Sequence, residues 1–212
     1  MSYTETVRFE ADIGKRKDMK IIAATKNKNK IREIHKIFSP LGFDVITQSE
    51  AGIDIDVEET GNTFEKNALI KARAVAMLCD DYVLSDDSGL CIDALGGKPG
   101  VYSARYAGDG ASDSDKINKV LSELDGEQNR RARFVSSMAF IFPDGTEITA
   151  RGEVIGRILS EPRGENGFGY DPIFFSDELG KTFAEATMEE KNSVSHRSRA
   201  LLALYNKLEN SI

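Results

Sequence analysis

The 212-residue sequence has little cysteine and no tryptophan. Its 2 cysteines, Cys79 and Cys91, are too few for a disulfide scaffold or for a metal site built from four thiolates. Unpaired thiols are typical of a reducing compartment, and we therefore expect a cytoplasmic protein.

The sequence also lacks a long apolar run. The longest stretch without a charged residue, 134–143, is far shorter than the roughly 20 apolar residues that cross a bilayer. Near the start, Glu5, Arg8 and Glu10 interrupt the region where a signal peptide would be continuously apolar. These features predict no membrane helix and argue against secretion.

Positive charge is in deficit, because 28 Lys and Arg stand against 35 Asp and Glu, which gives a net charge of −7. A protein that coats nucleic acid needs a basic surface, so this balance argues against a nucleic-acid partner. A small phosphorylated ligand needs only a local cluster of lysines. The hydrophobic content of 40% is typical of a globular chain and excludes a disordered one.

The length suits one domain, at most divided into two small lobes. Residues 1–18 are polar without periodicity and are interpreted as an N-terminal appendage, whereas 19–212 form the predicted domain. Helical and strand patterns alternate, and 143–145 (Pro-Asp-Gly) has the chemistry of a hairpin turn. The sequence predicts an α/β fold on a mixed sheet, in which an antiparallel pair joins parallel units around a cleft.

Hydrophobic spacing gives the expected elements. Asn62 with Glu65 predicts a helix start of the capping-box kind, and Thr187 with Glu190 predicts a second one. The expected strands are 21–24, 45–46, 82–85, 132–142 and 146–159, and the expected helices are 28–38, 62–78, a segment around 117–124, and 196–209.

Four polar clusters follow strands or begin helices, where α/β folds place their ligands. A helix that begins directly after the first strand offers unpaired backbone N–H groups and a positive dipole end, which suit a polyphosphate. The glycines of a P-loop are missing, and alone the cluster is better explained as a solvated basic turn. Its members are Thr25, Lys26, Asn27, Lys28, Asn29 and Lys30.

The second cluster, 86–89 (Asp-Asp-Ser-Gly), lies at the expected end of the third strand. Adjacent carboxylates repel each other unless a cation or a catalytic role compensates them. Neighbouring strand residues point to opposite faces, so one carboxylate is expected in the cleft and the other to brace the turn that Gly89 permits. The third cluster, Glu58 and Glu59, offers oxygen ligands suited to Mg²⁺, although alone it fits an exposed acidic loop.

The fourth cluster joins the loop 167–172 (Gly-Phe-Gly-Tyr-Asp-Pro) to Lys191, His196 and Arg197. Aromatic rings between glycines can stack on a base, and His, Arg and backbone N–H groups can donate to its oxo groups. The alternatives are core packing for the two rings and a polar helix start for His196 and Arg197. The co-occurrence of a phosphate site, carboxylates and a base platform favours a nucleotide ligand.

At these positions the sequence resembles the inosine triphosphate pyrophosphatase family, whose members hydrolyse deaminated purine nucleoside triphosphates. The resemblance runs from Met19 to the C-terminus, about nine-tenths of the chain. It implies an elongated mixed sheet flanked by helices, with a deep nucleotide cleft between two α/β lobes, in a protein that is usually a homodimer. The matching segments are 25–30, 58–61, 86–90, 99–106, 167–174, 190–191 and 195–197.

The resemblance also implies roles for individual residues. Asp87 would be the catalytic carboxylate, Ser88 would contact the substrate, and Glu58 with Asp87 would hold Mg²⁺. Lys26 departs from the family, which usually has Gly after the first Thr, and could add a phosphate contact of its own. Phosphate would be held by Thr25, Asn27, Lys30 and Lys71, and the base pocket would be lined by Phe168, Gly169, Tyr170, Asp171, Lys191, His196 and Arg197.

The expected reaction is hydrolysis of ITP, dITP or XTP to the monophosphate and pyrophosphate. Inosine and xanthine carry a 6-oxo acceptor where adenine carries an amino donor. Donors from Arg197, His196 and the 168–171 backbone therefore predict that ATP is rejected most strongly and GTP less. Two alternatives stay open: a pyrophosphatase for a modified pyrimidine triphosphate, and a nucleotide sensor without catalysis, although a sensor need not keep the carboxylates at 58 and 87.

Overall fold

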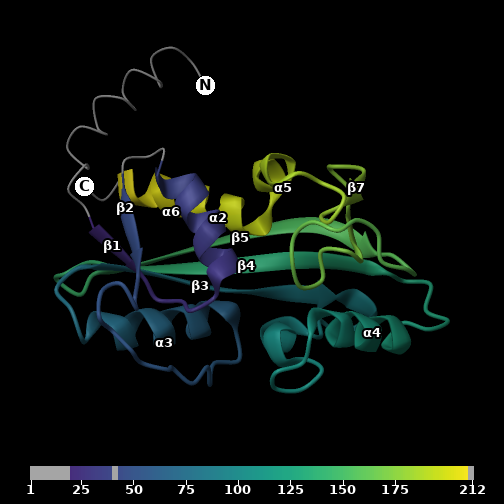
Figure 1. The fold of residues 1–212 in the computed structure, drawn as a ribbon, viewed down its shortest axis with the longest axis horizontal. Helices are drawn as coiled ribbons and strands as arrows, with labels where there is room; N and C mark the ends of the chain where they lie inside the picture. Colours follow the sequence, from purple (N-terminus) through teal and green to yellow (C-terminus); the bar gives the residue numbers. More distant parts are fainter. Residues whose placement is uncertain (1–19, 40–42, 210–212) are drawn as a thin grey trace, which may run out of the picture.

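The computed structural model describes residues 20–39 and 43–209, so the predicted appendage 1–18 and Met19 lie outside the described residues. Figure 1 shows an elongated sheet with helices on both faces. In chain order the elements are β1 (Lys20–Ala23), α2 (Lys28–Phe38), β2 (Asp44–Thr47), α3 (Phe64–Ala76), β3 (Tyr82–Ile92), η2 (Asp93–Leu95), η3 (Gly100–Arg105), α4 (Asp113–Glu123), β4 (Arg131–Ile141), β5 (Glu147–Ile158), β6 (Phe174–Ser176), β7 (Lys181–Thr182), α5 (Met188–Val194) and α6 (His196–Glu209).

The sheet has seven strands in the order β2-β1-β3-β4-β5-β6-β7. β1 pairs in parallel with β2 and β3, whereas the pairs from β3 to β7 are antiparallel. The turn between β4 and β5 follows its sequence, because Gly145 has a φ of +84° and the Asp144 carboxylate accepts from the Thr146 N–H at 2.8 Å. The predicted mixed α/β sheet is confirmed.

Alternating side chains of β1 divide the core between the two faces of the sheet. Ile21 and Ala23 pack under α2 and α6, whereas Ile22 and Ala24 pack under α3. At the far end of the sheet a third cluster joins β4, β6 and α4, with Phe134 at 4.7 Å from Phe174, centroid to centroid. In Figure 1, α2, α5 and α6 cover one face and α3 and α4 the other. Within the described ranges no helix is long and apolar enough to cross a bilayer.

Two local expectations are wrong. β3 continues to Ile92, so 86–89 lies inside a strand and not at a turn. Gly89 is required for another reason: a Cβ there would overlap Ser103 Oγ and the Gly100 carbonyl, so glycine admits the close approach of η3. The cap of α3 is Thr63 and not Asn62, whose side chain instead accepts from Lys66 Nζ at 3.2 Å. The second capping box, at Thr187, is confirmed.

Candidate active site

A cavity of about 410 Å³ runs beside β3, large enough for a nucleotide. One end is bounded by the turn after β1 and by Lys71 of α3, and the other by the loop 167–171, which we term the base loop. Lys28 and Glu58 are exposed and lie outside its lining. The other predicted residues line it: Thr25, Lys26, Asn27, Asn29, Lys30, Lys71, Asp87, Ser88, Phe168, Gly169, Tyr170, Asp171, Lys191, His196 and Arg197.

The turn before α2 is organised by its own side chains. Asn27 Oδ1 accepts from the N–H groups of Asn29 at 3.0 Å and Lys30 at 3.3 Å, and Thr25 Oγ1 accepts from the Asn27 N–H at 3.2 Å. These N–H groups are therefore capped by the protein and not unpaired, as the sequence had suggested. Lys28 is the first residue of α2 and turns outward, which removes it from the predicted phosphate contacts.

Two lysines from opposite faces of the sheet converge on β3. Lys30 of α2 lies 3.1 Å from Asp86 Oδ2, and burial lowers its pKa. Lys71 of α3 donates to Glu59 Oε1 at 2.6 Å and lies 3.7 Å from Asp87 Oδ1. Both ammonium groups also donate to the Asp86 carbonyl, at 3.2 and 2.9 Å. The cavity therefore has two inward cations at the end predicted to hold phosphate.

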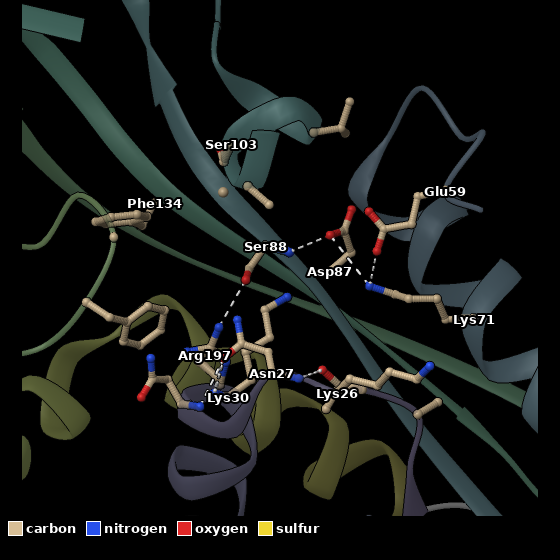
Figure 2. A pocket seen from close by; sticks show the side chains of 18 of the residues that line it. Lys26, Asn27, Lys30, Glu59, Lys71, Asp87, Ser88, Ser103, Phe134 and Arg197 are labelled. Atoms are coloured by element: carbon tan, nitrogen blue, oxygen red, sulfur yellow. Dashed lines mark hydrogen bonds and ion pairs between the residues drawn. The ribbon is translucent and has the colours of Figure 1, made fainter. Parts of the chain in front are cut away.

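The adjacent carboxylates of β3 point to opposite faces, as predicted: Asp86 contacts side chains of α2 and α6, whereas Asp87 contacts side chains of α3. Figure 2 shows Asp87 beside the Lys71 ammonium. Asp86 is fully buried, and although burial opposes it, the charges of Lys30 and Arg197 hold its pKa well below the usual range. Asp87 lines the cavity and accepts from Asn67 Nδ2 at 3.1 Å, and burial raises its pKa. Asp87 is thus the better proton acceptor, and Asp86 is a structural anion.

The acidic loop places Glu59, not Glu58, in the cavity. Exposed and partly buried side chains alternate from Asp54 to Thr60, so that Glu58 is exposed whereas Glu59 is partly buried. Figure 2 shows Glu59 and Asp87 on either side of the Lys71 ammonium. Two carboxylates that already face one cation suit Mg²⁺, which takes one or two carboxylates and completes its shell with water and phosphate. Among the described residues, no three His, Cys, Asp or Glu side chains form a metal-binding group.

Three backbone N–H groups of the base loop already donate hydrogen bonds within the protein. The Phe168 N–H donates to Asp171 Oδ2 at 2.9 Å, the Gly169 N–H donates to Asp113 Oδ2 at 2.6 Å, and the Asp171 N–H donates to the Phe168 carbonyl at 3.3 Å. Tyr170 is buried in the core, and its hydroxyl donates to the Ser103 carbonyl at 2.9 Å. Of the two rings, only Phe168 is partly exposed as a stacking surface, so core packing is correct for Tyr170.

The guanidinium group of Arg197 also donates hydrogen bonds within the protein. It is 1% exposed and donates to Asp86 Oδ2 from Nε and a terminal nitrogen at 3.2 and 3.1 Å, to Ser88 Oγ at 3.0 Å, and to Glu33. Glu33 of α2 also accepts from Lys191 Nζ, at 3.0 Å. Arg197 nevertheless lines the cavity, so its role toward the base stays a prediction. Glu33 does not line the cavity, but it is a buried partner of two lining residues that the sequence interpretation missed.

His196, at the same end of the cavity, has a ring nitrogen without a hydrogen-bond partner among the described residues. Its ring is buried and stacks on Phe134, with centroids 4.9 Å apart and planes 14° apart. Burial and the charges of Arg197 and Lys191 hold its pKa well below the usual range, so the ring is neutral. Nδ1 is buried and has no partner among the described residues. An unpaired buried polar atom is costly, and the side chain of Asn192 has two more such atoms.

Comparisons with known proteins show the family of this chain. The model of the Ham1 family matches residues 21–207. The chain belongs to the Ham1 family. It is 51% identical over 190 residues to the dITP/XTP pyrophosphatase of Bacillus subtilis, with 89% of this chain and 96% of that relative covered. The enzyme of the same name from Staphylococcus epidermidis is 50% identical, with 89% and 96% covered.

Solved Ham1 structures share the fold. The Ham1 protein of Staphylococcus aureus superposes with a TM-score of 0.82 at 44% identity, covering 91% of this chain and all of that one. The HAM1 protein of Coxiella burnetii gives 0.83 at 41%, covering 91% and 99%. The family resemblance inferred from the motifs is confirmed.

In this Ham1 chain, Lys26 stands at the position where glycine was expected. Its Nζ lies 3.4 Å from Asp54 Oδ1 and 3.9 Å from Asp56 Oδ1, both on the acidic loop. These carboxylates are 93% and 98% exposed, so the pairing contributes little to stability. The side chain therefore stays available to phosphate at the mouth of the cavity.

Proposed function

We propose that this chain hydrolyses non-standard purine nucleoside triphosphates, namely ITP, dITP and XTP, to the monophosphate and pyrophosphate. One observation carries the proposal: a single cavity joins two lysines and two carboxylates at one end to a partly exposed ring and a neutral histidine side chain at the other. The relatives named dITP/XTP pyrophosphatase support the same reaction. The biological role would be removal of damaged precursors from the nucleotide pool.

The phosphate end can supply the chemistry of this reaction. Water attacks the α-phosphorus, its oxygen enters the monophosphate, and the bond to the bridging α–β oxygen breaks to release pyrophosphate. Asp87 takes the proton of the attacking water, a role suited to a carboxylate with a raised pKa. Lys30 and Lys71 offset the charge that develops on the departing pyrophosphate.

Mg²⁺ is the proposed cofactor, and Glu59 with Asp87 would hold it. When bound, it would neutralise phosphate oxygens and polarise the scissile bond. Lys71, which now lies between these carboxylates, would then turn toward the phosphates, joined by Thr25, Asn27 and Lys26. These side chains would together bind a metal–triphosphate complex.

The first test of this function is a substrate panel with product identification. With Mg²⁺, ITP, dITP and XTP are expected to give monophosphate and pyrophosphate in phosphorus NMR, and EDTA is expected to abolish turnover. A modified pyrimidine triphosphate in the panel tests the alternative substrate class, and binding without turnover would identify a sensor. Orthophosphate as the first product from ITP would contradict the reaction and indicate a phosphatase.

A second test concerns the base. We infer that the neutral His196 ring, which lines the cavity, donates an N–H to the 6-oxo group of hypoxanthine or xanthine, whereas adenine presents a donor that cannot pair with it. His196→Phe keeps a ring against Phe134 but removes the donor, so kcat/KM for ITP is expected to fall by about 10- to 100-fold while that for ATP changes little. Steady-state kinetics with both nucleotides measure this ratio. An unchanged ratio would remove His196 from base recognition.

We also propose that the chain acts as a homodimer, as the family resemblance implies, and that it works in the cytoplasm, as its two cysteines suggest. Light scattering coupled to size-exclusion chromatography measures the mass directly, and a monomer at micromolar concentration would contradict the dimer.

A further inference from the structure

The base loop is attached to the protein on two sides. On one side, Asp171 Oδ2 lies 2.7 Å from the buried Lys191 ammonium. On the other side, the Tyr170 hydroxyl donates to the Ser103 carbonyl at 2.9 Å, and the Gly169 N–H donates to Asp113 Oδ2 at 2.6 Å. The tip of the loop is thus tied to η3 and to the start of α4 through two hydrogen bonds.

Asp113 is well placed to hold a backbone N–H group. It is the first residue of α4, where the helix dipole favours a negative charge. Its second oxygen lies 2.6 Å from Lys116 Nζ, whose side chain is 13% exposed. Partial burial opposes ionisation, but Lys116 and the Gly169 N–H outweigh it and lower the Asp113 pKa. The carboxylate is therefore charged, and its hydrogen bond to Gly169 is of the stronger, charge-assisted kind.

Among these attachments, the Asp113 bond is the one that water reaches. Tyr170, Asp171 and Lys191 are each at most 4% exposed, whereas the Asp113 side chain is 49% exposed. The loop tip can therefore open by breaking the Asp113 bond while the buried attachments stay in place. Asp113 and Lys116 line the cavity together with Phe168, so the position of this bond determines how closely the loop approaches a base.

We propose that Asp113 is a positioning residue for the base: it holds the loop tip against α4 and so sets the width of the base end of the cavity. This inference rests on the proposed function, which it extends by naming a determinant of substrate fit. Asp113 does not touch the groups around Asp87. Its loss should therefore weaken binding of the base and leave the chemical step largely unchanged.

Three full-length variants test this role. Asp113→Ala removes the acceptor, Asp113→Asn keeps an acceptor oxygen without the charge, and Asp109→Ala removes a charge from the exposed loop just before α4 as a control. Hydrogen–deuterium exchange of the peptide that covers 165–172, without nucleotide, reports how well the loop tip is held. Steady-state kinetics with ITP and GTP report its effect on substrate fit.

For Asp113→Ala we expect faster exchange in this peptide, a KM for ITP raised about tenfold with kcat within about threefold, and a lower ITP to GTP ratio of kcat/KM. Asp113→Asn is expected to restore most of the protection, and Asp109→Ala to match the wild type. Wild-type exchange and KM in Asp113→Ala would overturn the inference, as would equal effects of Asp109→Ala. A wild type that does not hydrolyse ITP overturns the proposed function, and wild-type exchange in Asp113→Ala overturns the inference whatever the activity.

Discussion

Replacing Asp87 with Asn is expected to lower kcat for ITP by about 10²- to 10⁴-fold while the protein stays folded. The amide is nearly isosteric and can still accept from Asn67 Nδ2, so the local packing is kept. It can neither take the proton of the attacking water nor bind Mg²⁺ as strongly. Circular dichroism checks that the variant is folded, and single-turnover kinetics measure the loss in the chemical step. If the variant keeps more than a tenth of the wild-type rate, the catalytic assignment is wrong.

The adjacent glutamates provide a matched control for the metal site. Glu59→Gln should reduce the affinity for Mg²⁺, because Glu59 lines the cavity beside Asp87, whereas Glu58→Gln should leave it unchanged, because Glu58 is exposed. A titration of activity against Mg²⁺ concentration gives the apparent Mg²⁺ affinity of each variant. A larger effect of Glu58→Gln would show that Glu58 is the metal ligand, as the family resemblance implies.

The titration of the same carboxylate can be followed directly. Burial raises the pKa of Asp87 in the metal-free protein, and a cation bound to a carboxylate lowers its pKa. In a titration followed by NMR, Asp87 is therefore expected to take up its proton at a higher pH in EDTA than with Mg²⁺. The same pKa under both conditions would contradict Asp87 as a metal ligand.

The elements with local sequence signals were predicted well. Thr187 caps α5 in the predicted capping box, because a short polar side chain can satisfy nearby N–H groups without help from the rest of the fold. The hairpin around Asp144 is also local. Apart from Lys28 and Glu58, the site residues that the sequence singled out all line the cavity, since the family motifs mark the ends of the elements that meet there.

The errors concern features that depend on tertiary contacts. Gly89 is a strand residue because β3 pairs with β4 along its whole length, and that pairing involves residues far apart in sequence. Which of two adjacent glutamates points inward depends on where the extended loop meets Lys71. Glu33 left a weak signal, because it follows Lys30 by three residues and precedes Ile34 on the inward face of α2. Its partners on α5 and α6 were not visible in the sequence.

Those partners form a continuous network of buried charges. Positive and negative groups alternate from the phosphate end of the cavity to the base loop, so that each charge has a counter-charge within the protein. The chain of contacts is Lys30, Asp86, Arg197, Glu33, Lys191 and Asp171. Arg197 links its two halves. Burial of unpaired charges is costly, so the stability of the cavity walls depends on this link.

Arg197→Ala is therefore expected to lower the free energy of unfolding by about 3–5 kcal/mol, because it leaves Asp86 and Glu33 buried with fewer counter-charges. Arg199→Ala is the matched control: it removes the same side chain two residues later on α6, where Arg199 is 39% exposed and pairs with Glu178, and should cost at most about 1 kcal/mol. Urea denaturation compares the two variants. Equal stabilities, together with a reduced preference for ITP over ATP in Arg197→Ala, would show that Arg197 reads the base and that the network contributes little to folding.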